Sequence, residues 1–284
     1  MRGYLTALSN GKSYADAAKV FGDLTALNRE ARRYVTSGSF DYRPVTVEVA
    51  RPIITRTRLL SQGEASLIGE TIAFRDDELS LFRKAGARKR EESLRLANLD
   101  RIRAKVVRFP DDPYGLYLLA ESEYSVGNLA QSETAADRLL AQNPSHVRGL
   151  ARKSLLLSTA ASKLTGPARA AKAKEARQLA GKANRLDKDN PMPLLAYYQS
   201  FNLAGEKPSP IAIKGLLQVV TMLPRDNNAR QLLVDQLARD KRYDEAIAWL
   251  LPIANSPHES PRREAARELR VKLEAAKATK AVAT

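Results

Sequence analysis

Short polar segments that contain proline, asparagine or aspartate return at regular distances along the chain, and this spacing limits the fold more than any other feature. Each segment interrupts apolar residues that recur at helical spacing, so each predicts the end of a pair of helices. A fixed period of roughly 20 to 50 residues is typical of arrays of stacked supersecondary units. The equivalent positions are Pro110, Pro144, Lys188, Pro224 and His258, which follow one another at steps of 34, 44, 36 and 34 residues.

Within each unit, the sequence predicts two helices joined by a tight turn. In the first clear unit, apolar residues recur three and four positions apart on both sides of Gly127 and Asn128, a pair that favours a turn. In the last unit, Ala246 is small enough to let two helices approach closely. Two of the steps exceed 34 residues, and we attribute the excess to loop insertions at residues 164–167 and 207–210, both of which contain proline.

Composition favours helices over strands. Alanine, leucine, arginine and lysine are abundant, while aromatic residues make up only 6% of the chain and hydrophobic residues 44%. That hydrophobic fraction is enough to bury a core, so we expect a folded, soluble, all-α protein. Cysteine is absent, which excludes disulfides, thiolate catalysis and cysteine-based zinc sites.

The period and the residue types together resemble the tetratricopeptide repeat (TPR) family, whose unit has small, large and proline positions in the same order. The resemblance extends over about residues 77–258, and residues 261–277 resemble the polar helix that caps such an array. It implies an all-α solenoid of helix pairs with about four to five repeats. It also implies a scaffold or adaptor that takes a peptide or protein segment in the concave groove lined by the first helices. A nonrepetitive helical bundle is the alternative, and the equal spacing argues against it.

Three segments are predicted along the chain. Residues 1–60 form a small N-terminal segment, with two short helices within residues 13–36. Apolar and polar residues alternate over residues 42–54, which favours an edge strand bounded by proline. Residues 61–260 hold the repeat array, and residues 261–284 form a capping helix followed by a disordered tail.

The N-terminal segment resembles the closing helices of bacterial metallopeptidase-like domains, on the run at residues 17–24 and its continuation through residues 27–34. In that family a similar head leads into tetratricopeptide repeats. The resemblance implies that the chain is the noncatalytic C-terminal part of an exported protein of this kind. The catalytic His-Glu-x-x-His signature is absent, since the two histidines, His146 and His258, lie 112 residues apart. No zinc ligand is carried over, so the peptidase part is either cut away from this chain or was never present.

No residue pattern predicts a catalytic centre. His146 and His258 fall in equivalent loops between units, where we expect solvated side chains. Glu121 and Glu123 are two positions apart on a helix and face different directions, so they cannot work as a paired acid and base. The glycines are isolated and form no phosphate-binding loop. We therefore expect no enzyme activity, no bound metal and no cofactor.

The N-terminus predicts the compartment. It has no apolar run of signal-peptide length, and no later segment approaches the length of a membrane span. As it stands, the chain is expected in the cytoplasm, without membrane insertion. If it is a fragment of a longer exported precursor, the expected compartment is the periplasm.

Positive charge is the one feature that points to a different partner. The net charge is +15 and the isoelectric point is near 10.0, which supplies a nonspecific attraction to nucleic acid. The excess is spread almost evenly along the chain. Its two denser stretches, residues 83–108 and 163–188, have apolar residues between the charges, and we interpret them as solvated outer faces of helices. A nucleic-acid binder is therefore the less favoured alternative to a protein binder.

The predicted groove follows from the first helix of each unit, because first helices line the concave side in this architecture. Tyrosine and arginine are frequent anchors of protein interfaces. The residues that we expect to line the groove are Tyr114, Tyr117, Glu121, Tyr124, Arg148, Ala151, Gln199, Asn202, Asp235 and Arg239.

Overall fold

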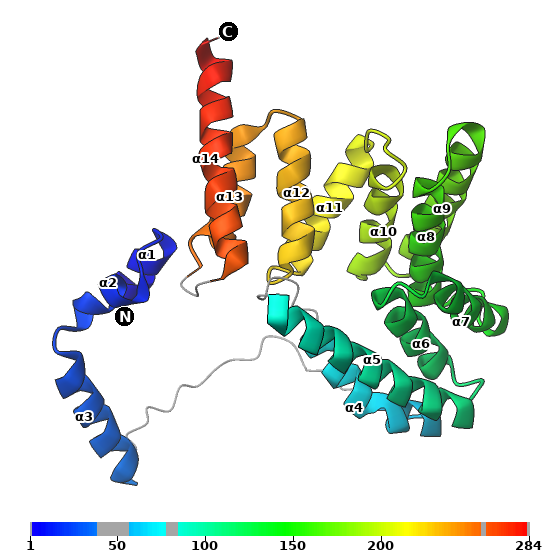
Figure 1. Ribbon diagram of the computed structural model, residues 1–284, viewed down its shortest axis with the longest axis horizontal. Helices are drawn as coiled ribbons and strands as arrows, with labels where there is room; N and C mark the ends of the chain where they lie inside the picture. Colours follow the sequence, from blue (N-terminus) through cyan, green and yellow to red (C-terminus); the bar gives the residue numbers. More distant parts are fainter. Residues whose placement is uncertain (1, 39–56, 78–84, 257–259, 283–284) are drawn as a thin grey trace. The chain divides into compact units, whose positions relative to one another are not determined.

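A computed structural model describes residues 2–38, 57–77, 85–256 and 260–282. Every regular element in these ranges is a helix (Figure 1), which confirms the predicted all-α class. The strand predicted at residues 42–54 and the loop residue His258 lie outside the described residues. Within the described ranges, no helix combines the length and the apolar character that a membrane span requires.

The chain forms two compact units. The smaller comprises Met1–Leu59 and Leu251–Glu268, and the larger comprises Leu60–Leu250 and Leu269–Thr284. The helices of the N-terminal part of the smaller unit are α1 (Arg2–Ser9), α2 (Tyr14–Ala18), a 3-10 turn (Lys19–Phe21) and α3 (Leu24–Thr36).

The two short helices predicted within residues 13–36 are α2 and α3, and each begins at a capping side chain. Ser13 accepts a hydrogen bond from the Asp16 N–H, and Asp23 accepts from the N–H groups of the first turn of α3. Helix α1 was not predicted from the sequence. Within the same unit, Asn255 Nδ2 donates a hydrogen bond of 2.8 Å to the carbonyl of Ser9 at the end of α1.

The larger unit consists of helix pairs. The first helices are α4 (Gln62–Asp77), α6 (Pro113–Ser125), α8 (Val147–Ser162), α10 (Pro191–Asn202) and α12 (Asn227–Arg239). The second helices are α5 (Ala85–Arg108), α7 (Leu129–Gln142), α9 (Gly166–Leu186), α11 (Pro210–Met222) and α13 (Tyr243–Ala254). A last helix, α14 (Pro261–Val282), follows them, and both α13 and α14 have residues in each unit.

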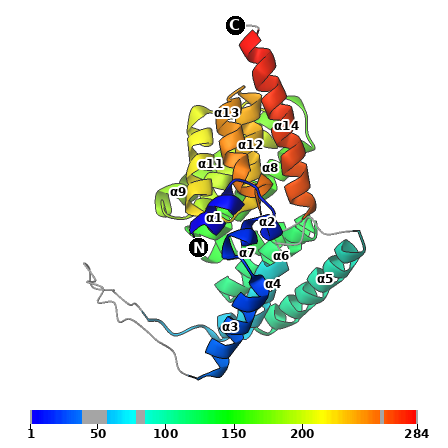
Figure 2. The ribbon, with the colours of Figure 1, turned by 90° about the vertical axis from the view of Figure 1, so that its left-hand side faces the viewer.

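Successive pairs stack as a helical-repeat solenoid. Helix α7 packs against both α6 and α8, and α9 packs against both α8 and α10. The first helices also contact one another, from α4 to α6, from α6 to α8 and from α8 to α10, so they form a continuous layer. Helices α11 and α12 lie side by side in both views (Figures 1 and 2).

Four first helices begin at equivalent capping side chains. Each side chain accepts a hydrogen bond of 2.9 to 3.1 Å from a backbone N–H of the first turn, which satisfies a donor that the helix leaves unpaired. Each cap lies two residues after a position that defined the repeat, so the predicted period is the spacing of helix starts. The caps are Asp112, His146, Asn190 and Asp226.

The loop insertion predicted at residues 164–167 is wrong. The turn between α8 and α9 is as short as the turn between α6 and α7, and the helices are longer instead. Helix α8 has 16 residues against 13 in α6, and α9 has 21 against 14 in α7, which accounts for the whole excess of the 44-residue step. Gly166, with a φ of 56°, and Pro167 start a helix here, because the first turn needs no N–H from proline. The insertion predicted at residues 207–210 does coincide with the longer turn between α10 and α11, and its last residue, Pro210, starts α11.

Small residues allow α9 to pack closely on its neighbours. Its buried side is a row of alanines spaced three and four positions apart, all fully buried. Ser154 Oγ of α8 donates a hydrogen bond of 2.8 Å to the carbonyl of Ala176 across this contact. Side chains longer than a methyl group would separate the two helices. The alanines are Ala173, Ala176, Ala180 and Ala183.

We expect Ala176→Leu to destabilise the array. The larger side chain would overpack the contact between α8 and α9 and lower the free energy of unfolding by about 1–3 kcal/mol. The measurement is urea unfolding followed by circular dichroism. Ala171→Leu, at an exposed position of the same helix, is the control and should change stability little. Equal stability of the two variants would contradict the close packing.

Candidate functional site

Four of the predicted groove residues lie on one face of α6. Tyr114, Tyr117, Glu121 and Tyr124 are three or four positions apart, which places them one above the other along the helix, and all are half-buried. The Tyr114 hydroxyl lies 2.8 Å from Oγ1 of Thr71 in α4. The rings of Tyr114 and Tyr117 meet edge to face, with their centres 6.5 Å apart. This face of α6 therefore presents three phenol rings along its length.

Side chains of α8 contact Tyr117, Glu121 and Tyr124. Arg152 donates hydrogen bonds to both carboxylate oxygens of Glu121, with 2.6 Å between Nε and Oε1, and its guanidinium lies 4.2 Å from the ring centre of Tyr124. The Tyr124 hydroxyl lies 3.1 Å from Oγ1 of Thr159. The guanidinium of the exposed Arg148 lies 5.3 Å from the ring centre of Tyr117. We call this cluster the α6–α8 face: Tyr114, Tyr117, Glu121, Tyr124, Arg148 and Arg152.

The ion pair within the α6–α8 face is well shielded from water. Arg152 is 6% exposed, and its burial disfavours the charged form. The carboxylate of Glu121 outweighs that effect, so the pKa of Arg152 lies above its ordinary value. The planar fork of arginine matches a carboxylate at two points, which fixes the orientation of both side chains. Because Glu121 is neutralised in this way, Arg148 sets the charge that the face offers to a partner.

His146 is a half-buried helix cap rather than the solvated loop residue that the sequence predicted. Its Nδ1 accepts a hydrogen bond of 3.0 Å from the N–H of Gly149, so Nδ1 carries no proton and the imidazole is neutral. The ring centre lies 6.2 Å from that of Tyr117, beside the α6–α8 face. Burial, and secondly the charge of Arg148, lowers the pKa of His146 below its ordinary value.

The other predicted groove residues form separate contacts on α10 and α12. Asn202 Nδ2 lies 3.3 Å from Oε1 of Gln199, within α10. Asp235 accepts a hydrogen bond of 2.8 Å from Gln231, within α12. The exposed Arg239 connects the two helices, since its Nη2 donates a bond of 2.9 Å to the hydroxyl of Tyr198. The structure therefore brings five of the predicted residues together and leaves Gln199, Asn202, Asp235 and Arg239 in contacts of their own.

The groove residue predicted on α8 is wrong by one position. Ala151 was predicted in the groove, but it is 1% exposed and packs in the core with Leu155 and Ala180. The next residue, Arg152, is the one that reaches the α6–α8 face. Its signal was available, because Arg152 lies four positions after Arg148 and shares its side of the helix. Among the described residues, no group of three or more His, Asp or Glu side chains could hold a metal ion.

Comparisons with known proteins identify the fold. No protein-family model matches the chain, and no curated protein matches its sequence. Among solved structures, the TPR protein TTC0263 of Thermus thermophilus superposes with a TM-score of 0.53, at 20% identity, over 73% of this chain and 98% of that one. The chain has a tetratricopeptide-repeat fold. A TPR protein from Parabacteroides merdae also matches, at 13% identity and a TM-score of 0.47, over 100% of this chain and 93% of that one.

The TPR fold gives the site its context. Helices α6 and α8 are the first helices of consecutive TPR-type repeats, so the α6–α8 face lies in the layer that first helices form. The predicted resemblance to TPR proteins is confirmed at the level of the fold. The resemblance of residues 17–34 to metallopeptidase-like domains stays a prediction.

The cap at His146 predicts a pH-dependent stability. The unfolded chain takes up a proton at the ordinary histidine pKa near 6.5, whereas the folded chain does so only at lower pH. The stabilisation that the neutral His146 cap contributes to folding is therefore complete above about pH 6.5. It is lost as the pH falls from there through the folded-state pKa of His146. His146→Asn keeps a capping side chain that does not titrate, so its free energy of unfolding should fall less between pH 7.5 and pH 5.5.

Urea unfolding of both proteins at the two pH values measures this difference. His146→Ala serves as the control, because it removes the cap at every pH and should cost about 1 kcal/mol. An equal fall in stability for the parent and His146→Asn would show that His146 does not titrate in this way.

Proposed function

We propose that the chain is a noncatalytic interaction scaffold that binds a segment of a partner protein on the α6–α8 face. The TPR-type fold supports this proposal, since stacked helix pairs create extended binding surfaces. The single observation that carries it is the row of Tyr114, Tyr117 and Tyr124, which contacts with α4 and α8 hold in one arrangement. Tyrosine supplies a large contact area with a polar tip, and few torsions have to be fixed on binding.

The hydrogen bonds of the face favour binding because they order it in advance. Tyr124 is fixed by Arg152 and Thr159, and Tyr114 is fixed by Thr71. Side chains that are already ordered lose little entropy when a partner arrives, which leaves more of the contact energy for affinity. A partner segment that fits should pack apolar side chains against the rings and place an acceptor near Arg148. Residues Gln199, Asn202, Asp235 and Arg239 would extend the surface along α10 and α12.

Removing two anchors tests the proposal. Tyr117→Ala with Arg148→Ala deletes a ring and the cation above it, and should weaken capture of partner proteins about tenfold or more. The parent and the variant are immobilised and incubated with a lysate of the organism that makes the protein, and bound proteins are quantified by mass spectrometry. Leu186→Ala with Arg225→Ala, at exposed positions of the larger unit, is the matched control. Capture of the same proteins in the same amounts by both variants would contradict the proposal.

The basic charge supports a second candidate, a nucleic-acid binder. Many of the cations are already engaged, however: Lys153 lies 2.7 Å from both Glu133 and Asp137, and Arg103 is paired with Glu123. Cations with internal partners contribute less to binding phosphates. Binding to labelled RNA and duplex DNA at increasing salt separates the two candidates. A submicromolar affinity that falls steeply with salt would favour nucleic acid.

The resemblance at residues 17–34 supports a narrower version of the scaffold, in which the chain is the C-terminal part of an exported metallopeptidase-like protein. That version is compatible with binding on the α6–α8 face. The test is the genomic sequence upstream of Met1, and an in-frame signal peptide with a His-Glu-x-x-His motif would support it.

A further inference from the structure

A set of cavities lies over the first helices, between neighbouring second helices. Three cavities share one construction, in which a first helix forms the floor and the second helices before and after it form the walls. They lie over α6 between α5 and α7, over α10 between α9 and α11, and over α12 between α11 and α13. Their volumes are about 440, 480 and 1160 Å³, in that order. None of their linings includes a residue of the α6–α8 face.

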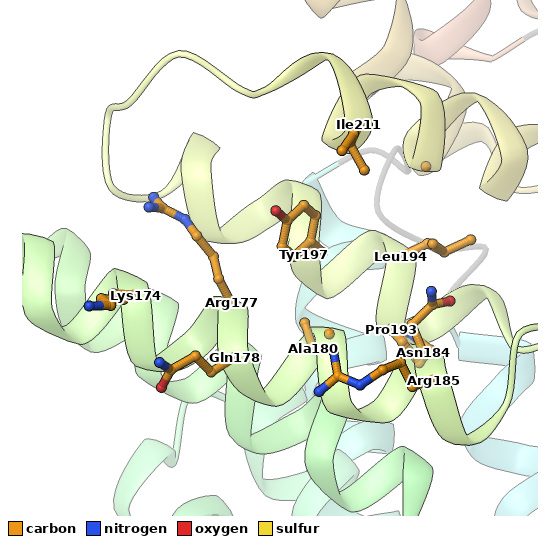
Figure 3. Close-up of a pocket in the computed structure, with 12 residues that line it drawn as sticks. Lys174, Arg177, Gln178, Ala180, Asn184, Arg185, Pro193, Leu194, Tyr197 and Ile211 are labelled. Atoms are coloured by element: carbon orange, nitrogen blue, oxygen red, sulfur yellow. The ribbon is translucent and has the colours of Figure 1, made fainter.

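Charge distinguishes these cavities from one another. In the cavity over α6, Arg103 is paired with Glu123 in the same lining, and Arg138 donates to the carbonyl of Pro110. The cavity over α12 includes two carboxylates, Asp240 and Glu245, among its cations. The lining of the cavity over α10 contains cations and no acid (Figure 3). We call it the α9–α11 cavity: Lys174, Arg177, Gln178, Ala180, Gly181, Asn184, Arg185, Pro193, Leu194, Tyr197, Ile211 and Gly215.

Two of the three cations in the α9–α11 cavity are not engaged elsewhere. Arg177 is fixed, because its Nη2 lies 2.6 Å from Oε2 of Glu206 and its guanidinium lies over the ring of Phe201. Lys174 and Arg185 are exposed and form no ion pair or hydrogen bond in the part of the chain that the structure describes. A free lysine and a free arginine at opposite ends of a lining without carboxylates create a positive local field.

Apart from the amides of Gln178 and Asn184, the remainder of the lining is mainly apolar. Pro193, Leu194 and Tyr197 of α10 form the floor, and Ile211 projects toward them from the first turn of α11 (Figure 3). Ile211 is 75% exposed, so it offers apolar surface to a partner. The volume of about 480 Å³ is enough for a bulky apolar side chain with adjoining backbone.

We propose that the α9–α11 cavity binds an acidic segment of a partner protein, with one bulky apolar side chain among Leu194, Tyr197 and Ile211 and with carboxylates at Lys174 and Arg185. Charge complementarity carries this choice, because the free cations have no acid within the lining to satisfy them. Tyr197 is the single aromatic ring in the lining, whereas successive bases stack on several rings, and Pro193, Leu194 and Ile211 offer aliphatic surface; this favours a protein segment over nucleic acid. The site is a second surface, independent of the proposed function of the α6–α8 face.

Peptide selection on the full-length chain tests the proposal. A random peptide library displayed on phage is selected on the parent protein, after depletion on Lys174→Glu with Arg185→Glu. The surviving peptides should be enriched in Asp and Glu around a bulky apolar residue. A representative peptide, synthesised with a fluorescent label, should bind the double variant about tenfold or more weakly than the parent. Ile211→Asp should weaken the same peptide, since it adds a carboxylate at an exposed position of the apolar wall.

Two controls make the outcome specific. Lys188→Glu with Arg225→Glu introduces the same charge change at exposed positions outside the cavity and should leave peptide binding unchanged. Tyr117→Ala should also leave it unchanged, which separates this site from the α6–α8 face. If Lys174→Glu with Arg185→Glu is poorly folded by circular dichroism, the two glutamine substitutions replace it.

The proposal is overturned by any of three results. Selected peptides without acidic residues would contradict the charge argument. Equal binding of an acidic peptide to the parent and the cavity variants would show that the peptide binds outside the α9–α11 cavity. Loss of binding to an oligouridine probe in the double variant, without enrichment of acidic peptides, would make the cavity a nucleic-acid site.

Discussion

The starts of the first helices are the constraint on which the remaining structure depends. At each start, a side chain accepts a hydrogen bond from the first turn, and this bond decides which residue is the first of the helix. The choice of first residue fixes which side chains face the neighbouring helices and which face outward. Tyr114 and Arg148 each lie two positions after their caps, Asp112 and His146, and so occupy equivalent positions on α6 and α8. The α6–α8 face is a consequence of that shared register.

Close packing between these helices then stacks the pairs into a solenoid. The fully buried alanines of α9 let it contact both α8, in its own pair, and α10, in the next pair. This double contact connects successive pairs. The first helices form a continuous layer, and neighbouring second helices flank the cavities over α6, α10 and α12. The same architecture thus yields two chemically different surfaces. On one, Arg152 is buried and paired with Glu121; on the other, Lys174 and Arg185 have no such partner.

Much of this architecture could be predicted from the sequence, because helix starts have local signals. The polar loops at Pro110, Pro144, Lys188 and Pro224 each precede a cap by two residues, so their spacing revealed the repeat directly. Helix length has no comparable signal: Gly166 and Pro167 can end one helix or begin another, and only packing against α8 and α10 decides. The pairing of Arg152 with Glu121 depends on a neighbouring helix, although its position four residues after Arg148 was visible in the sequence. The cap at His146 is local, and it was missed because histidine is not among the usual capping residues.

The central claim is that partner proteins bind the α6–α8 face. Its most direct test is photo-crosslinking in living cells, with a benzophenone amino acid in place of Tyr117 and, in a second strain, in place of the exposed Leu186 of α9. After irradiation, crosslinked species are purified and identified by mass spectrometry. The account predicts a discrete protein adduct from position 117 that is absent from position 186. Adducts of equal yield from both positions, or adducts to RNA alone, would contradict it.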